Sequence, residues 1–120
     1  MTANPEEMQI FTLTYDMLRW LLPHSERFPR AQRFVVTKRL QDAALDFQET
    51  IYLANAHSGR TREGHLRTAD GHLNKLRSYL RLVHEWGWLN AGQYAHVSKM
   101  VTQIGQRLGG WLKQTMGLKK

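Results

Sequence analysis

The side chains of this 120-residue chain that could do chemistry are mainly cationic, and their spacing is helical. Arg67, Asn74, Arg77, Arg81 and His84 follow one another at steps of seven, three, four and three residues. Residues at these spacings share one face of an α-helix. A row of guanidinium groups can bind phosphates through charge and the release of counterions, without reading a base sequence. The row therefore predicts a surface that binds a polyanion.

Further basic residues extend this prediction beyond one helix face. The chain has 17 basic and 10 acidic residues, a net charge of +7, and no acidic residue follows Glu85. Such a field suits nucleic acid or an acidic protein surface, and the simpler interpretation is a well-solvated exterior. We expect nucleic-acid or protein-partner binding to involve eight residues: Arg30, Arg33, Arg67, Lys75, Arg77, Arg81, Arg107 and Lys113.

The residue pattern offers little for catalysis or for a bound cofactor. Cysteine is absent, and none of the six histidines is three or four residues from another or follows a Glu-x-x-His pattern. These patterns are the usual signatures of thiolate chemistry and of metal sites in helical bundles. Asp42, Asp46 and Glu49 form an acidic row, but Lys38 lies four residues before Asp42, the spacing of a surface ion pair. We therefore expect no metal, no cofactor and no enzymatic activity.

Apolar residues recur at steps of three and four along most of the chain, which predicts helices and no sheet. We expect one domain over residues 1–120, with helices at roughly 8–22, 29–55, 66–86 and 90–116. Pro23 should end the first helix, residues 55–64 should form a loop, and Asn90 with Gln93 should cap the fourth helix. Long helices with short connections predict an all-α, up-down-up-down four-helix bundle.

Neither a membrane-spanning segment nor a signal peptide is expected. No apolar run approaches the length of a membrane span, and the first residues lack the pattern of a secretory leader. The predicted location is the cytoplasm.

Three glycines interrupt the fourth predicted helix. Gly105, Gly109 and Gly110 precede Trp111, although each glycine in a helix interior costs about 1 kcal/mol relative to alanine. Close approach of another helix is the usual reason for such a cost, so we expect these four residues to serve helix packing or oligomer contacts. Whether that neighbour belongs to the same chain or to another subunit stays open.

The apolar faces of the predicted helices are also wide, so they too could contact either the same chain or another subunit. In the first helix, a row predicted to face the core (Phe11, Tyr15, Leu18, Leu22) is accompanied by a second row (Leu13, Met17, Leu21). A wide core face within one chain and a contact between subunits both explain the second row.

Four segments resemble the accessory variability determinant (Avd) proteins of diversity-generating retroelements, over roughly residues 11–114. The segments are Ile104-Gly105-x-x-Leu108-Gly109-Gly110-Trp111-Leu112-Lys113, Leu73-x-x-Leu76-Arg77-x-x-x-Arg81-Leu82, Phe28-Pro29-Arg30-x-x-Arg33-Phe34 and Tyr15-Asp16-x-x-x-Trp20.

This resemblance implies a four-helix-bundle protomer that assembles into a pentameric, basic barrel. It also implies a non-catalytic accessory role: the protein would bind the reverse transcriptase of the element and RNA or DNA, and would support mutagenic retrohoming of a template RNA into a variable gene region. Arg77 and Arg81 match the basic residues of the third helix in that family, so the resemblance implies a role for them in partner binding.

Three other interpretations compete with this one. The proteins encoded by intervening sequences in 23S ribosomal RNA genes are also similar and share the fold, although the Gly-Gly-Trp ending favours Avd. A structural bundle that binds only an acidic protein would need no nucleic acid. A metal-dependent enzyme is the third alternative, and the missing ligand motifs argue against it.

Overall fold

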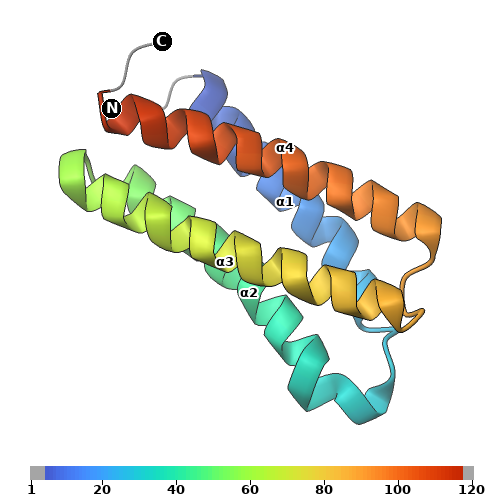
Figure 1. Ribbon diagram of the computed structural model, residues 1–120. Helices are drawn as coiled ribbons and strands as arrows, with labels where there is room; N and C mark the ends of the chain where they lie inside the picture. The colour runs from blue at the N-terminus through green and yellow to red at the C-terminus, as the bar shows by residue number, and fades with distance from the viewer. Residues whose placement is uncertain (1–4, 118–120) are drawn as a thin grey trace.

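The computed structural model describes residues 5–117 and is helical almost throughout (Figure 1). The described residues hold four α-helices and no strand: α1 (Pro5–Ser25), α2 (Lys38–Asn55), α3 (Gly59–Glu85) and α4 (Ala91–Thr115). A short 3-10 helix, η1 (Arg30–Gln32), and one π-helical turn, η2 (Arg33–Thr37), lead into α2. The all-helical prediction is therefore confirmed.

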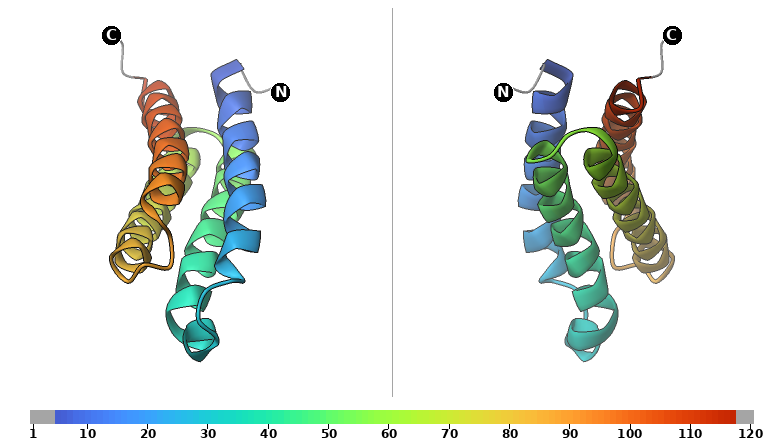
Figure 2. Two further views of the ribbon diagram at one scale, coloured as in Figure 1. Left: turned by 90° about the vertical axis from the view of Figure 1, so that its right-hand side faces the viewer. Right: turned by 90° about the vertical axis from the view of Figure 1, so that its left-hand side faces the viewer.

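The four helices lie antiparallel to their chain neighbours in an elongated bundle of 45 × 25 × 20 Å (Figures 1 and 2). Each helix packs on the next along the chain, and α4 closes the ring against α1. Figure 2 shows the bundle from two opposite sides, and in both views the α1–α2 connection extends beyond the end of α3. The connections between α2 and α3 and between α3 and α4 are short, because antiparallel helices need only a few residues to turn back.

The core is a continuous apolar column along the bundle axis. Its fully buried side chains come from all four helices: Ile10, Met17, Leu21, Leu40, Ala44, Phe47, Ile51, Leu66, Leu73, Leu76, Val83, Val97 and Ile104. Steps of three and four recur within each helix, so each contributes one buried stripe.

The buried face of α1 differs from the row predicted for it. Tyr15 is 56% exposed, whereas Met17 and Leu21 of the second row are fully buried, together with Ile10. The residues Phe11, Leu13 and Leu22 lie at the margins, partly buried against the core. The second row is thus explained within one chain, and Tyr15 is the apolar residue left outside.

The end of α1 also corrects the sequence prediction, because α1 continues past Pro23 to Ser25. Proline in the last turn removes a single backbone bond, and side chains bind the carbonyls that remain there. Nδ1 of His24 lies 2.6 Å from the carbonyl oxygen of Trp20, and Oγ of Ser25 donates to the carbonyl oxygen of Leu22 at 2.7 Å.

The predicted helix over 29–55 is three segments rather than one. Pro29 precedes η1, and the wider turn of η2 follows before the regular α2 begins. A π-helical turn holds one more residue than an α-helical turn, so it rotates the side chains on either side relative to each other. Leu40 and Phe47 consequently face the core, while Phe34 and Val35 are 77% and 52% exposed.

The predicted loop over 55–64 is mostly helix, because α3 begins at Gly59. The true connection is Ala56 to Ser58, followed by Gly59 with a φ of +59°, a conformation that suits glycine. Nε of Arg62 donates to the carbonyl oxygen of Ala54 at 3.0 Å, which satisfies an end group of α2 from the first turn of α3. The turn formers therefore shape a three-residue link rather than a ten-residue loop.

The start of α4 confirms the predicted cap. Oδ1 of Asn90 accepts from the backbone N–H of Gln93 at 2.8 Å, and Oε1 of Gln93 accepts from the backbone N–H of Asn90 at 2.9 Å. This reciprocal pair is a capping box. Between residues 5 and 117, no helix combines the length and apolar character that a membrane-spanning helix needs.

Candidate polyanion interface

The basic row predicted for the third helix lies on the side of α3 that borders α4. Arg67, Arg77 and Arg81 are exposed, and the row ends at His84, whose ring stacks on Tyr94 of α4. The ring centroids of this pair are 4.2 Å apart, with 5° between the planes. The row therefore follows the α3–α4 boundary and is anchored to α4 at one end.

The guanidinium group of Arg77 lies over Gly105 of α4. A Cβ atom at residue 105 would collide with Nη2 of Arg77 and would lie 3.6 Å from Cδ2 of Leu73. Nη1 of Arg77 also donates to Oδ1 of Asn74 at 2.7 Å. The missing side chain at Gly105 provides the space in which this guanidinium group rests, so Gly105 has a packing role inside the chain.

Arg77 and Arg81 line a shallow depression of about 270 Å³ between α3 and α4. Hydroxyl groups of Ser98 and Thr102 on α4 border the same depression, with Tyr94 at one end. Guanidinium and hydroxyl groups are the side-chain donors that bind phosphate and carboxylate oxygens. The depression can thus bind an anionic group through both helices.

Two arginines of the row have acidic neighbours one helical turn away. Nε of Arg67 lies 3.0 Å from Oε2 of Glu63, and Nε of Arg81 lies 3.4 Å from Oε2 of Glu85. These pairs are exposed, and exposed ion pairs contribute about 0–1 kcal/mol. They orient the guanidinium groups but are weak enough to be exchanged for a phosphate.

The other predicted binding residues lie on different faces of the chain. Lys75 is exposed and lines a groove between α2 and α3 that also contains Asp42 and Asp46. Arg107 is half-buried in a groove between α1 and α4, and Lys113 is exposed in the last turn of α4. Within one chain, the structure therefore does not bring the eight predicted residues onto one surface.

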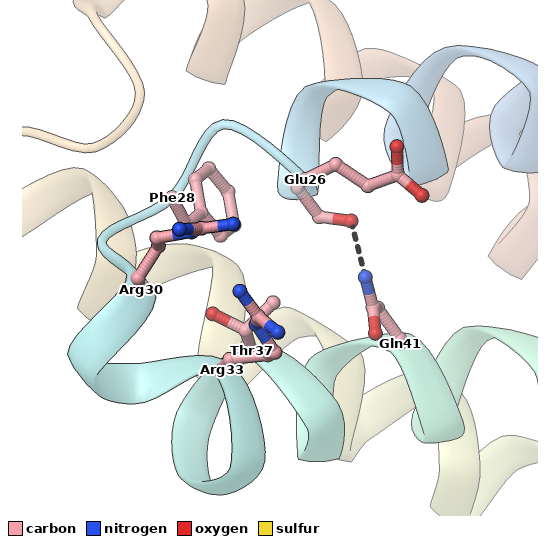
Figure 3. A pocket seen from close by; sticks show the side chains of 7 residues that line it. Glu26, Phe28, Arg30, Arg33, Thr37 and Gln41 are labelled. Carbon is pink, nitrogen blue, oxygen red and sulfur yellow. Dashed lines mark hydrogen bonds between the residues drawn. The ribbon is translucent and has the colours of Figure 1, made fainter.

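Arg30 and Arg33 lie together at the α1–α2 connection, far along the bundle from the middle of α3. They line a pocket of about 380 Å³ with Ser25, Glu26, Phe28, Thr37 and Gln41. Figure 3 shows both guanidinium groups turned toward the space between the connection and the first turns of α2, with the Glu26 carboxylate pointing away. This pair is a second, separate cationic site.

Gly109 and Gly110 of α4 have no packing partner among the described residues. A Cβ atom at Gly109 or Gly110 would meet nothing within 4 Å among the described residues. Trp111 is instead buried in the core, where it makes an edge contact with Phe11 at 5.9 Å between ring centroids. Trp111 thus serves packing within the chain, and a subunit contact at Gly109 and Gly110 stays a prediction.

Two surface features were missed by sequence reasoning. The first is the exposure of the apolar side chains of Phe34 and Leu53. The second is the part played by Ser25, Thr37 and Gln41 in the pocket at the α1–α2 connection. Helical periodicity gives no signal for the second, because the pocket depends on an irregular segment of backbone.

The acidic and histidine residues behave as surface groups. Nζ of Lys38 lies 2.6 Å from Oδ2 of Asp42, as the spacing predicts. Among residues 5–117, no three His, Asp or Glu side chains come together in a way that could hold a metal ion.

These features define the class of protein: a small antiparallel helical bundle with a net positive charge and several exposed apolar side chains. The chain matches the family model described as bAvd-like over residues 8–115, nearly its whole length, and it belongs to that family. The predicted resemblance to Avd proteins is thereby confirmed. The curated proteins contain no match to the chain.

Proposed function

We propose that this protein is a non-catalytic accessory protein of a diversity-generating retroelement, acting in the cytoplasm. It binds the cognate reverse transcriptase and the template RNA or its cDNA, and so supports mutagenic retrohoming. Family membership supports the accessory role. The observation that carries the binding role is the exposed arginine row of α3, held over Gly105 at the α3–α4 boundary.

The α3 row supports binding to a polyanion because one regular helix presents its arginines along one side. Arg77 is held by Asn74 and by the space above Gly105, and Arg81 lines the same depression. Side chains that are already oriented lose less conformational entropy on binding. No acidic residue of α4 opposes them, since the chain has none after Glu85.

The proposed assembly is a homopentamer. The exposed apolar residues and the uncovered glycines of α4 support it, since a soluble monomer rarely exposes large contiguous apolar patches. Phe34 is 77% exposed, and Tyr52 and Leu53 are about half exposed on α2. Subunits arranged around a ring would bring basic residues from different faces of one chain closer to those of its neighbours.

The binding role is tested with the double variant Arg77→Gln/Arg81→Gln. We expect less reverse transcriptase to co-purify with this variant, and a slope of log affinity against log salt for single-stranded RNA that is reduced by about 1.4, because two phosphate contacts are lost. The matched control is Arg19→Gln/Arg39→Gln, which removes the same charge from exposed positions on α1 and α2. Equal losses of binding in both variants would show that the α3 row contributes only through the net charge of the protein, not through its position. RNA binding that is absent at low salt would favour a bundle that recognises only an acidic protein.

The assembly is tested with Gly109→Leu. We expect the solution mass to fall while helicity is retained, because leucine would fill a subunit contact, whereas a Cβ atom at residue 109 meets no described residue within 4 Å. Gly71→Leu on α3 is the matched control, since Gly71 is also open and helical. Unchanged mass in Gly109→Leu would contradict a contact at this position.

A further inference from the structure

The α1–α2 connection holds a pocket in which two arginines and one threonine lack partners among residues 5–117. Neither Arg30 nor Arg33 makes an ion pair with any residue between 5 and 117, although other arginines have acidic partners one turn away. Arg33 lies 5.6 Å from the ring centroid of the exposed Phe34, a contact that leaves its N–H groups available. Two guanidinium groups therefore share one pocket, and neither is paired with a carboxylate of the described residues.

Thr37 adds an independent observation in the same pocket. Thr37 is only 5% exposed, and its Oγ1 has no hydrogen-bond partner among the residues that the structure describes. A buried helical threonine normally donates to the carbonyl oxygen four residues earlier, as Thr50 does to Asp46 at 2.7 Å. Thr37 closes the π-helical turn and does not make this bond. Thr14, Thr115 and Nε1 of Trp111 are also buried without a partner among the described residues, and Thr37 differs from them in lining this pocket with two arginines. Since most buried polar groups are satisfied, a ligand in the pocket can supply the partner that Thr37 lacks.

The walls of the pocket are held by packing and by hydrogen bonds from both helices. Nε2 of Gln41 donates to Oγ of Ser25 at 2.8 Å, and this hydroxyl in turn donates to the carbonyl oxygen of Leu22. Ser25 is 1% exposed, so this chain of bonds fixes the end of α1 against α2. Phe28 is buried beside the pocket and packs on Trp88, with 5.4 Å between ring centroids.

From this arrangement we infer that the pocket lined by Arg30, Arg33 and Thr37 is a binding site for a single phosphate group. Two guanidinium forks and one hydroxyl present more N–H and O–H donors than a carboxylate can accept, whereas a phosphate has enough oxygens to use them. The only carboxylate in the lining, Glu26, points away from the guanidinium groups in Figure 3. The volume of about 380 Å³ leaves room for the molecule that carries the phosphate.

The phosphate has two sources with the same chemistry, free phosphate and the backbone of a nucleic acid. For the nucleic-acid source, the inference rests on the proposed function. Binding of free phosphate does not depend on the proposed function, because the α3 row and this pocket lie on different elements. The pocket also differs in kind from the α3 row, since its arginines are unpaired and are accompanied by a buried hydroxyl.

The test titrates the full-length protein with inorganic phosphate against chloride at matched ionic strength, and follows the backbone amide resonances of Thr37 and Gln41. We expect saturable shifts. Thr37→Val should weaken phosphate binding about tenfold, because one hydrogen bond to a charged group is lost. Arg30→Gln/Arg33→Gln should remove saturable binding. The matched control, Arg39→Gln, removes an exposed charge between Thr37 and Gln41 that does not line the pocket, and it should leave the affinity unchanged.

A second arm identifies the source with a short single-stranded RNA. Competition between this RNA and inorganic phosphate would assign the pocket to the nucleic-acid backbone, and unchanged phosphate affinity in its presence would assign it to free phosphate. The inference is overturned if no saturable shift occurs, or if Thr37→Val, checked for retained helicity, binds phosphate as tightly as the parent chain. If the protein binds phosphate but binds neither reverse transcriptase nor RNA, the proposed function is wrong and the phosphate site still stands.

Discussion

The middle of α3 and the α1–α2 connection each present two arginines, but they hold them in different ways. Arg77 and Arg81 belong to a regular helix, and each has a polar or acidic neighbour one turn away. Arg30 and Arg33 belong to a 3-10 and a π-helical segment and line one pocket, where neither makes an ion pair with a described residue. A regular helix spreads charge along a line, whereas the irregular segment concentrates it around one point. The first arrangement suits an extended polyanion, and the second suits one group.

The stability of the molecule should depend mainly on the regular region, and Leu73→Ala tests this with the largest expected effect. Leu73 is fully buried on α3 and lies beneath the contact between Arg77 and Gly105. We expect a loss of about 2–5 kcal/mol in the free energy of unfolding, measured with denaturant, because a large side chain is replaced by a cavity. Leu112→Ala, at a half-buried position on α4, should cost less. A loss below that of Leu112→Ala would show that the α3–α4 contact is not a centre of stability.

The connection should behave in the opposite way, and Thr37→Val is expected to raise stability. The substitution removes a buried hydroxyl that has no partner, so we expect a gain of about 1 kcal/mol in the free energy of unfolding in phosphate-free buffer. The control is Thr50→Val, where the hydroxyl is already bonded to the carbonyl oxygen of Asp46 and no gain is expected. A gain of equal size at Thr50 would remove the distinction between the two sites.

The smallest effect concerns the ion pairs of the regular region. Glu85→Gln should change the free energy of unfolding by less than about 1 kcal/mol, because the Arg81–Glu85 pair is exposed. The same substitution should strengthen RNA binding slightly at low salt, since it removes a negative charge beside the α3 row. Weaker binding in this variant would mean that Glu85 orients Arg81 more than it competes with the phosphate.

Regular periodicity accounts for the parts of the fold that were predicted well. The four helices, the leucine stripe of α3 and the capping box at Asn90 follow from local spacing and residue type, because a helix repeats every 3.6 residues. The arginine row of α3 was visible for the same reason.

Predictions failed where the outcome depended on neighbours in space. Pro23 does not end α1, since it lies in a last turn whose carbonyls are bonded by side chains. The segment from Gly59 to Gly64 is helical, and Arg62 there donates to the end of α2. Tyr15 has the spacing of a core residue but is exposed, because α1 packs on a face shifted toward Ile10 and Met17.

By itself, the sequence determined the helical class, the cationic character and the arginine row of α3, since composition and local periodicity suffice for each. The resemblance it carries also led to the family. Only the tertiary structure decided which glycine packs inside the chain: Gly105 faces Arg77 of another helix, whereas a Cβ atom at Gly109 or Gly110 would meet none of the described residues within 4 Å. It also brought Arg30, Arg33 and Thr37 around one pocket, because a π-helical turn and the end of α1 meet there. Contacts between elements depend on how the helices rotate and cross, and the local spacing of residues does not predict either.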